Sequence, residues 1–198
     1  MSTLSKPYLT PEQYLAIERQ AEFKSEYYQG EMFAMSGARR AHNLIAVNAV
    51  RELSQQLRGR SCEAYSNDMR VRGTSEDLYT YPDLIIVCGE PKFLDNTFDT
   101  LLNPTVIVEI LSESTEAYDR GQKFKLYRSL DSLAEYLLIS SQQVSAELFT
   151  RQSDGLWLLN AKSSLEDSLE LHSVDCRLRL ADLYEKVAFP APQPPAAA

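Results

Sequence analysis

The stretch Tyr81-Pro-Asp-Leu-Ile-Ile-Val-Cys88 has the pattern of a buried strand, and so does Thr105-Val-Ile-Val-Glu-Ile-Leu111 further along the chain. Short, continuous apolar runs of this kind are typical of strands inside a sheet. Each run nevertheless carries one carboxylate, Asp83 in the first and Glu109 in the second. A buried acid is costly unless it is paired, shifts its pKa or binds a metal. These two strands therefore indicate where function is to be sought.

A lysine lies on the apolar side of the helix that we expect after the second strand. Leu126, Tyr127 and Leu130 follow Lys123 at three, four and seven residues, so the four side chains form one stripe. For a lone lysine, the ordinary explanation is a stem that covers apolar surface and an ammonium that reaches solvent. Beside two buried acids we favour a functional role, with Lys123 pointing across the sheet toward Glu109.

The remaining pattern predicts the α/β (α+β) class, with a mixed sheet flanked by helices, an N-terminal hairpin and a C-terminal β extension. We expect helices over 10–20, 39–58, 119–130 and 180–187, a hairpin over 24–35, and strands near 62–72, 82–88, 105–111, 134–140, 144–150, 156–161 and 168–174. Gln29-Gly30 is a typical hairpin turn. Asp119-Arg-Gly-Gln122 resembles a capping box, so Asp119 is interpreted as a cap. One domain over 10–188 would lie between an N-terminal arm, 1–9, and a disordered Pro/Ala tail, 189–198.

Composition limits the classes of function. At 198 residues the chain has the size of one ordinary domain, and no apolar run approaches the roughly 18 residues of a membrane span. No secretion signal is visible, so a cytoplasmic location is expected. Cys62, Cys88 and Cys176 are widely spaced, which predicts neither a disulfide framework nor a zinc site. A net charge of −8 argues against a protein that coats nucleic acid without specificity.

The chemistry that best fits the two acids is the binding of a hard cation. If the two strands are neighbours, Asp83 and Glu109 can converge on one face of the sheet. Two carboxylates, with water and a substrate phosphate, suit the octahedral shell of Mg²⁺ or Mn²⁺. The ammonium of Lys123 would stabilise charge that develops at the phosphate. Taken singly, Asp83 has a strand cap as its alternative role, and Glu109 has a salt bridge.

Two further residues are auxiliary candidates. Glu31 follows the turn glycine and can reach the end of the sheet. His42 faces inward at the start of a helix, where a hydrogen-bonded structural role is the commoner one.

Together these residues resemble the signature of the Uma-two family of restriction endonucleases, within the PD-(D/E)xK nuclease superfamily. The similarity spans about Thr10 to Val187 and rests on Gly30-Glu31, Ser36-Gly37, His42, Tyr81-Pro-Asp83, Val108-Glu-Ile-Leu-Ser112, Ser114-Thr115, Asp119, Lys123, Tyr127 and Glu135-Tyr136. The resemblance implies a restriction-endonuclease-like fold, magnesium on Asp83 and Glu109, catalysis by these two acids with Lys123, and DNA as substrate. It leaves open whether the protein is a homodimer.

One departure from the superfamily pattern matters, because Leu111 stands where a lysine is expected two residues after Glu109. Lys123, on the following helix, is the natural substitute. The first hypothesis is a metal-dependent endonuclease that hydrolyses phosphodiester bonds of DNA. The alternative is a catalytically inactive nucleic-acid-binding or assembly protein with the same fold, which Leu111 and the acidic net charge favour. Hydrolysis of a small phosphate ester is a weaker third hypothesis.

Overall fold

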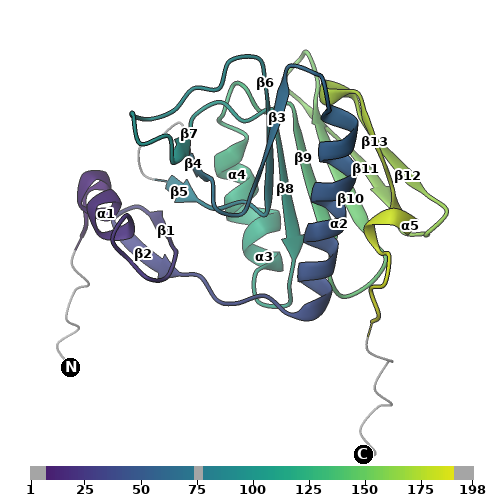
Figure 1. Cartoon of the computed structure of the whole chain (residues 1–198), viewed down its shortest axis with the longest axis horizontal. Helices are drawn as coiled ribbons and strands as arrows, with labels where there is room; N and C mark the ends of the chain where they lie inside the picture. Colours follow the sequence, from purple (N-terminus) through teal and green to yellow (C-terminus); the bar gives the residue numbers. More distant parts are fainter. Residues whose placement is uncertain (1–7, 74–77, 190–198) are drawn as a thin grey trace, which may run out of the picture.

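A six-stranded mixed sheet forms the centre of the protein, which we describe from a computed structural model over residues 8–73 and 78–189 (Figure 1). The strand order is β11-β10-β9-β8-β6-β3, and only the pair β8–β9 is parallel. The strands are β3 (Cys62–Ser66), β6 (Leu84–Cys88), β8 (Val106–Leu111), β9 (Glu135–Ser140), β10 (Ala146–Arg151) and β11 (Trp157–Lys162). The predicted class, a mixed sheet flanked by helices, is confirmed.

Two smaller sheets complete the β structure. The first, of order β2-β1-β5-β4-β7, contains the predicted N-terminal hairpin, and the second is a C-terminal hairpin. Their strands are β1 (Ser25–Tyr28), β2 (Glu31–Ala34), β4 (Arg70–Arg72), β5 (Leu78–Thr80), β7 (Thr100–Leu101), β12 (Ser168–Leu171) and β13 (Cys176–Arg179). The single strand predicted over 62–72 is wrong, because a turn in which Met69 N–H donates to Ser66 O separates β3 from β4.

The helical segments follow the sequence pattern at their starts more closely than at their ends. They are α1 (Pro11–Glu18), α2 (Arg40–Leu57), α3 (Glu116–Tyr118), the π-helical turn η1 (Asp119–Lys123), α4 (Phe124–Tyr127), the 3₁₀ turn η2 (His172–Val174) and α5 (Leu180–Leu183). Thr10 caps α1, since its side-chain oxygen accepts a hydrogen bond from Gln13 N–H at 3.3 Å. The last helix ends at Leu183 rather than near Val187.

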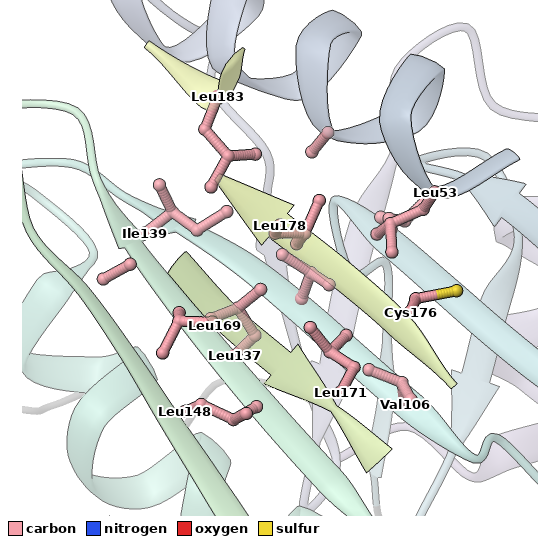
Figure 2. Close-up of a cluster of buried hydrophobic side chains, with 14 of the residues drawn as sticks. Leu53, Val106, Leu137, Ile139, Leu148, Leu169, Leu171, Cys176, Leu178 and Leu183 are labelled. Carbon is pink, nitrogen blue, oxygen red and sulfur yellow. The ribbon is translucent and has the colours of Figure 1, made fainter. Parts of the chain in front are cut away.

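Strand alternation gives the central sheet two different faces. Helix α2 packs on one face through four buried residues at helical spacing, Ile45, Ala49, Leu53 and Leu57. Figure 2 shows Leu53 in this cluster, together with Ile139 of β9 and Leu178 of β13. On the other face, Ile107 and Leu111 pack with Tyr127 of α4. Glu109 shares this second face by alternation, so it is directed away from α2.

The cysteine prediction is wrong in one respect. Cys62 and Cys88 lie directly opposite each other in the β3–β6 pairing and form a disulfide, while Cys176 is a buried free thiol. The pairing of strands brings these two sulfurs together although 26 positions separate them in the chain. In the part of the chain that the structure describes, no helix is long and apolar enough to cross a membrane. Most of the predicted N-terminal arm and tail lies outside the described residues.

Candidate functional site

The register of β6 and β8 places Asp83 beside Glu109. The two strands are antiparallel, with Leu84 opposite Val108. Extending this register by one residue places Asp83 opposite Glu109. The Oδ2 atom of Asp83 accepts a hydrogen bond from the backbone N–H of Ile110 at 2.7 Å. The two carboxylates that the sequence singles out therefore lie at one end of two neighbouring strands.

Glu109 is paired with Lys123 in the interior. The side chain of Glu109 is only 5% exposed, and its Oε1 lies 3.0 Å from Lys123 Nζ. The hydroxyl of Tyr127 donates to the same oxygen at 3.1 Å. Burial raises the pKa of Glu109 well above its ordinary value, against the charge of Lys123 and with the help of Asp119 and Asp83. A carboxyl whose pKa is shifted by burial and by neighbouring charges is found both at functional sites and in structural ion pairs.

The ammonium of Lys123 contacts two more carboxylates. Its Nζ lies 3.0 Å from Glu26 Oε1 and 3.5 Å from Asp119 Oδ1. Burial alone would lower the pKa of Lys123, but Glu109 and the other acids outweigh burial and raise it well above the ordinary value. Residues from β1, β8 and η1 thus surround one buried lysine. We call Glu26, Asp83, Glu109, Asp119 and Lys123 the carboxylate–lysine cluster.

The π-helical turn η1 carries both Asp119 and Lys123 into this cluster. The interpretation of Asp119 as a helix cap is wrong, because the helical segment begins earlier, after Thr115, and continues through Asp119. Asp119 is instead buried, and burial raises its pKa against the opposing charge of Lys123. Single π turns within helices occur frequently at functional sites. Here the turn places an acid and a lysine, four residues apart, on the side that faces the sheet.

The structure brings one auxiliary candidate into direct contact with the site. His42, in the first turn of α2, has its Nε2 2.9 Å from Asp83 Oδ1. Both oxygens of Asp83 are therefore held, one by His42 and one by the Ile110 N–H. Glu31 lies in β2 directly opposite Tyr28, next to the hairpin turn.

Glu26 is the site residue that sequence reasoning missed. It lies in β1, a short strand in which a charged residue would ordinarily face solvent. Its Oε1 contacts Lys123 and also accepts a hydrogen bond from Tyr81 N–H at 3.2 Å, two residues before Asp83. The only local signal is alternation, which places Glu26 on the opposite side of the strand from the apolar Tyr27. That signal does not distinguish a solvent-facing acid from one that meets a lysine.

The donor chemistry of the cluster fits a hard divalent cation. Asp83 and Glu109 supply carboxylate oxygens from adjacent strands, and Mg²⁺ commonly binds through one or two carboxylates plus water and substrate phosphate. Among the described residues, no group of three or more His, Cys, Asp or Glu side chains could hold a metal ion by itself. His42, a borderline donor, contacts Asp83, whereas the other donors of the cluster are carboxylate oxygens, so the set suits magnesium or manganese better than zinc.

Comparison with known proteins agrees with this architecture. A solved structure described as a putative nuclease belonging to DUF820, from Anabaena variabilis, superposes with a TM-score of 0.73 at 16% identity, over 89% of this chain and 97% of that one. This similarity shows that the two proteins share a fold.

Two relatives from Synechocystis sp. are much closer in sequence. The uncharacterized protein slr1290 is 38% identical and covers 92% of this chain and 95% of its own. The uncharacterized protein sll1609 is 39% identical, over 76% of this chain and 85% of its own length. Residues 11–181 match the Uma2 family, whose description is "Putative restriction endonuclease". From this match and the relatives we conclude that the chain belongs to the Uma2 family.

Proposed function

We propose that this protein is a metal-dependent endonuclease that hydrolyses phosphodiester bonds of DNA. Asp83 and Glu109 would hold Mg²⁺ or Mn²⁺, and Lys123 would face the scissile phosphate. The observation that carries the proposal is the 3.0 Å contact between Lys123 Nζ and Glu109 Oε1. It provides Glu109 with a neighbouring lysine, although Leu111 stands where its own strand would carry one. Family membership and the shared fold support the nuclease class.

The position of Leu111 explains why the lysine comes from another element. Leu111 is 2% exposed and packs in the apolar cluster with Tyr127 and Tyr136, so this end of β8 serves the core. Lys123 reaches Glu109 from η1 instead. A positive charge therefore lies beside the acid although the local motif is incomplete, which favours the enzyme over a catalytically inactive relative.

Each protein group has a separate role in the proposed reaction. Magnesium, when bound, supplies positive charge at the phosphate and lowers the pKa of water. Lys123 offers a buried ammonium that stabilises negative charge on the phosphoryl oxygens as water attacks phosphorus and the ester P–O bond breaks. Glu26 and Asp119 hold that ammonium in place. His42 and the Ile110 N–H orient Asp83.

The test compares the wild type with Glu109→Gln and Lys123→Met on supercoiled plasmid and single-stranded DNA. We expect Mg²⁺-dependent cleavage that EDTA abolishes, and a loss of at least about a hundredfold in each variant. Calorimetry should show that Glu109→Gln also loses Mg²⁺ affinity. Lys125→Met is the matched control, since Lys125 is exposed on the same helical segment, and it should cleave at the wild-type rate.

Thermal melting must accompany these assays, because removing one partner of a buried ion pair destabilises a protein by about 3–5 kcal/mol. Cleavage is therefore measured well below the melting temperature of Lys123→Met. A wild type that cuts neither plasmid, single strand nor RNA with any divalent ion would contradict the proposal. The alternative, a catalytically inactive nucleic-acid-binding or assembly protein, would then hold. Light scattering can determine whether the protein is a homodimer, which the sequence leaves open.

A further inference from the structure

The two faces of the β1–β2 hairpin make different contacts. On one face, Tyr27 packs with Tyr14 of α1, and Met32 joins the same apolar cluster. The opposite face carries Glu26, whose carboxylate contacts Lys123. In the antiparallel pairing, Phe33 lies directly across from Glu26. Residues directly across from each other point to the same face of a sheet, with Cβ atoms about 5 Å apart. Phe33 therefore stands next to the carboxylate–lysine cluster.

On this face the residue of β1 is buried, whereas its partner in β2 is exposed. Glu26 is 9% exposed, whereas Phe33 is 47% exposed. Met35, the residue that follows β2, is 36% exposed. On the same face Tyr28 is held by Gln122, whose side-chain amide donates to the Tyr28 hydroxyl at 2.8 Å. The ring of Phe33 in β2 thus borders the proposed catalytic centre, and the partner strand β1 is held there by Glu26 and Tyr28.

A half-exposed ring in this place suits a flat apolar partner. Nucleobases stack on aromatic side chains, and each stacked base contributes substantially to binding. In a duplex the base faces are covered by their neighbours, so a protein ring reaches them only when the nucleotide is unpaired or flipped out. The net charge of −8 limits the contribution that phosphate contacts can make. Stacking is an interaction that does not depend on this charge.

We propose that Phe33 stacks on an unpaired base next to the scissile phosphate, so that the enzyme prefers single-stranded or frayed DNA to intact duplex. The inference rests on the proposed nuclease function and adds its substrate class. Phe33 is a positioning residue in this scheme, because it holds the nucleotide while the carboxylate–lysine cluster performs the chemistry. Glu26, its cross-strand neighbour, links the position of the hairpin to the position of Lys123.

The experiment measures binding in EDTA, where metal-dependent cleavage does not interfere. The probes are a single-stranded oligonucleotide with one 2-aminopurine and the same sequence as a closed hairpin duplex. For the wild type we expect tighter binding of the single strand and quenching of 2-aminopurine. Phe33→Ala should weaken single-strand binding about tenfold and change duplex binding less than about twofold. Phe33→Trp keeps a stacking surface and should retain both affinity and quenching.

Phe98→Ala is the matched control. Phe98 is 61% exposed in the segment between β6 and β7 and packs on Phe93, with ring centroids 5.4 Å apart. This variant should bind single strands as the wild type does. Unchanged single-strand affinity in Phe33→Ala, or equal losses for single strand and duplex, would overturn this inference and leave the nuclease proposal standing. A wild type that binds neither probe would also overturn this inference, whereas the nuclease proposal is decided by the cleavage assay with divalent ions.

Discussion

At the scale of single residues, Asp99 joins two arginines that lie far apart in the sequence. Its Oδ2 is 2.8 Å from Arg19 Nε, at the end of α1, and 2.7 Å from Arg70 Nη2, in β4. Arg70 is almost fully buried, and its guanidinium lies over the ring of Tyr81. Burial acts to raise the pKa of Asp99, but the hydrogen bonds from Arg19 and Thr100 and the charge of Arg70 outweigh it and lower the pKa to about 2.

This shift predicts how stability depends on pH. A carboxyl whose pKa is lowered by folding stabilises the protein above its unfolded pKa, near 3.8, and loses that contribution as pH falls toward about 2. Asp99→Asn should therefore lower the free energy of unfolding at neutral pH by about 1–2 kcal/mol, with allowance for solvent screening. Urea titrations should show that the difference from wild type shrinks between pH 4 and pH 2.

The control is Asp68→Asn, because Asp68 forms an ion pair with Lys24 but its side chain is 82% exposed. Exposed pairs contribute little, so this variant should stay within about 0.5 kcal/mol of wild type at every pH. A difference for Asp99→Asn that does not change with pH would contradict the prediction.

At the scale of elements, the turn of the β1–β2 hairpin depends on one glycine. Gln29 and Gly30 both have positive φ, at 46° and 87°, which is the conformation of the tight turns that match strand twist. A Cβ on Gly30 would clash with the ring of Tyr8. Gly30 O also accepts a hydrogen bond from Leu9 N–H at 2.9 Å. The turn is thus restricted both by its backbone conformation and by the chain that crosses it.

Gly30→Ala should destabilise the protein by about 1 kcal/mol or more, because alanine is strained at this φ and Tyr8 must move. Amide hydrogen exchange should accelerate in β1 and β2, which carry Glu26 and Phe33. Gly37→Ala is the matched control, since its Cβ meets nothing within 4 Å and its φ lies outside the left-handed region. Equal effects of the two substitutions on urea unfolding would contradict this account of the turn.

At the scale of the whole molecule, two apolar clusters lie on opposite faces of the central sheet. The larger joins α2, the sheet, β12–β13 and α5, and it stabilises the fold from the side that faces away from Glu109. The other lies beneath α4 and borders the carboxylate–lysine cluster. The larger cluster can therefore be destabilised without a direct change to the carboxylate–lysine cluster.

Leu53→Ala should lower the free energy of unfolding by about 2–5 kcal/mol, since Leu53 is fully buried between α2 and the sheet and its loss leaves a cavity. Val47→Ala on the same helix is the control, because Val47 is 64% exposed, and it should change stability by less than about 0.5 kcal/mol. Urea unfolding at constant pH measures both. A small effect at Leu53 would show that this cluster is not the main source of stability.

The sequence by itself determined the features that depend on neighbouring residues. Repeated apolar positions set the buried face of α2, and Thr10 with Pro11 set the start of α1. The turn at Gly30 set the hairpin. The apolar strands around Asp83 and Glu109 marked two residues of the candidate site. These features were predictable because spacing, capping and backbone conformation act over a few residues and leave a local pattern.

Only the tertiary structure decided which distant groups meet. Glu26 contacts Lys123 across 97 positions of the chain, and nothing in β1 marks that acid as buried. Cys62 meets Cys88 because β3 pairs with β6. Asp119 is buried because its helical segment begins before it rather than at it. The physical reason is common to all three. A side chain's partners depend on strand order and helix register, which result from packing the entire core and leave no periodic signal in a short stretch of sequence.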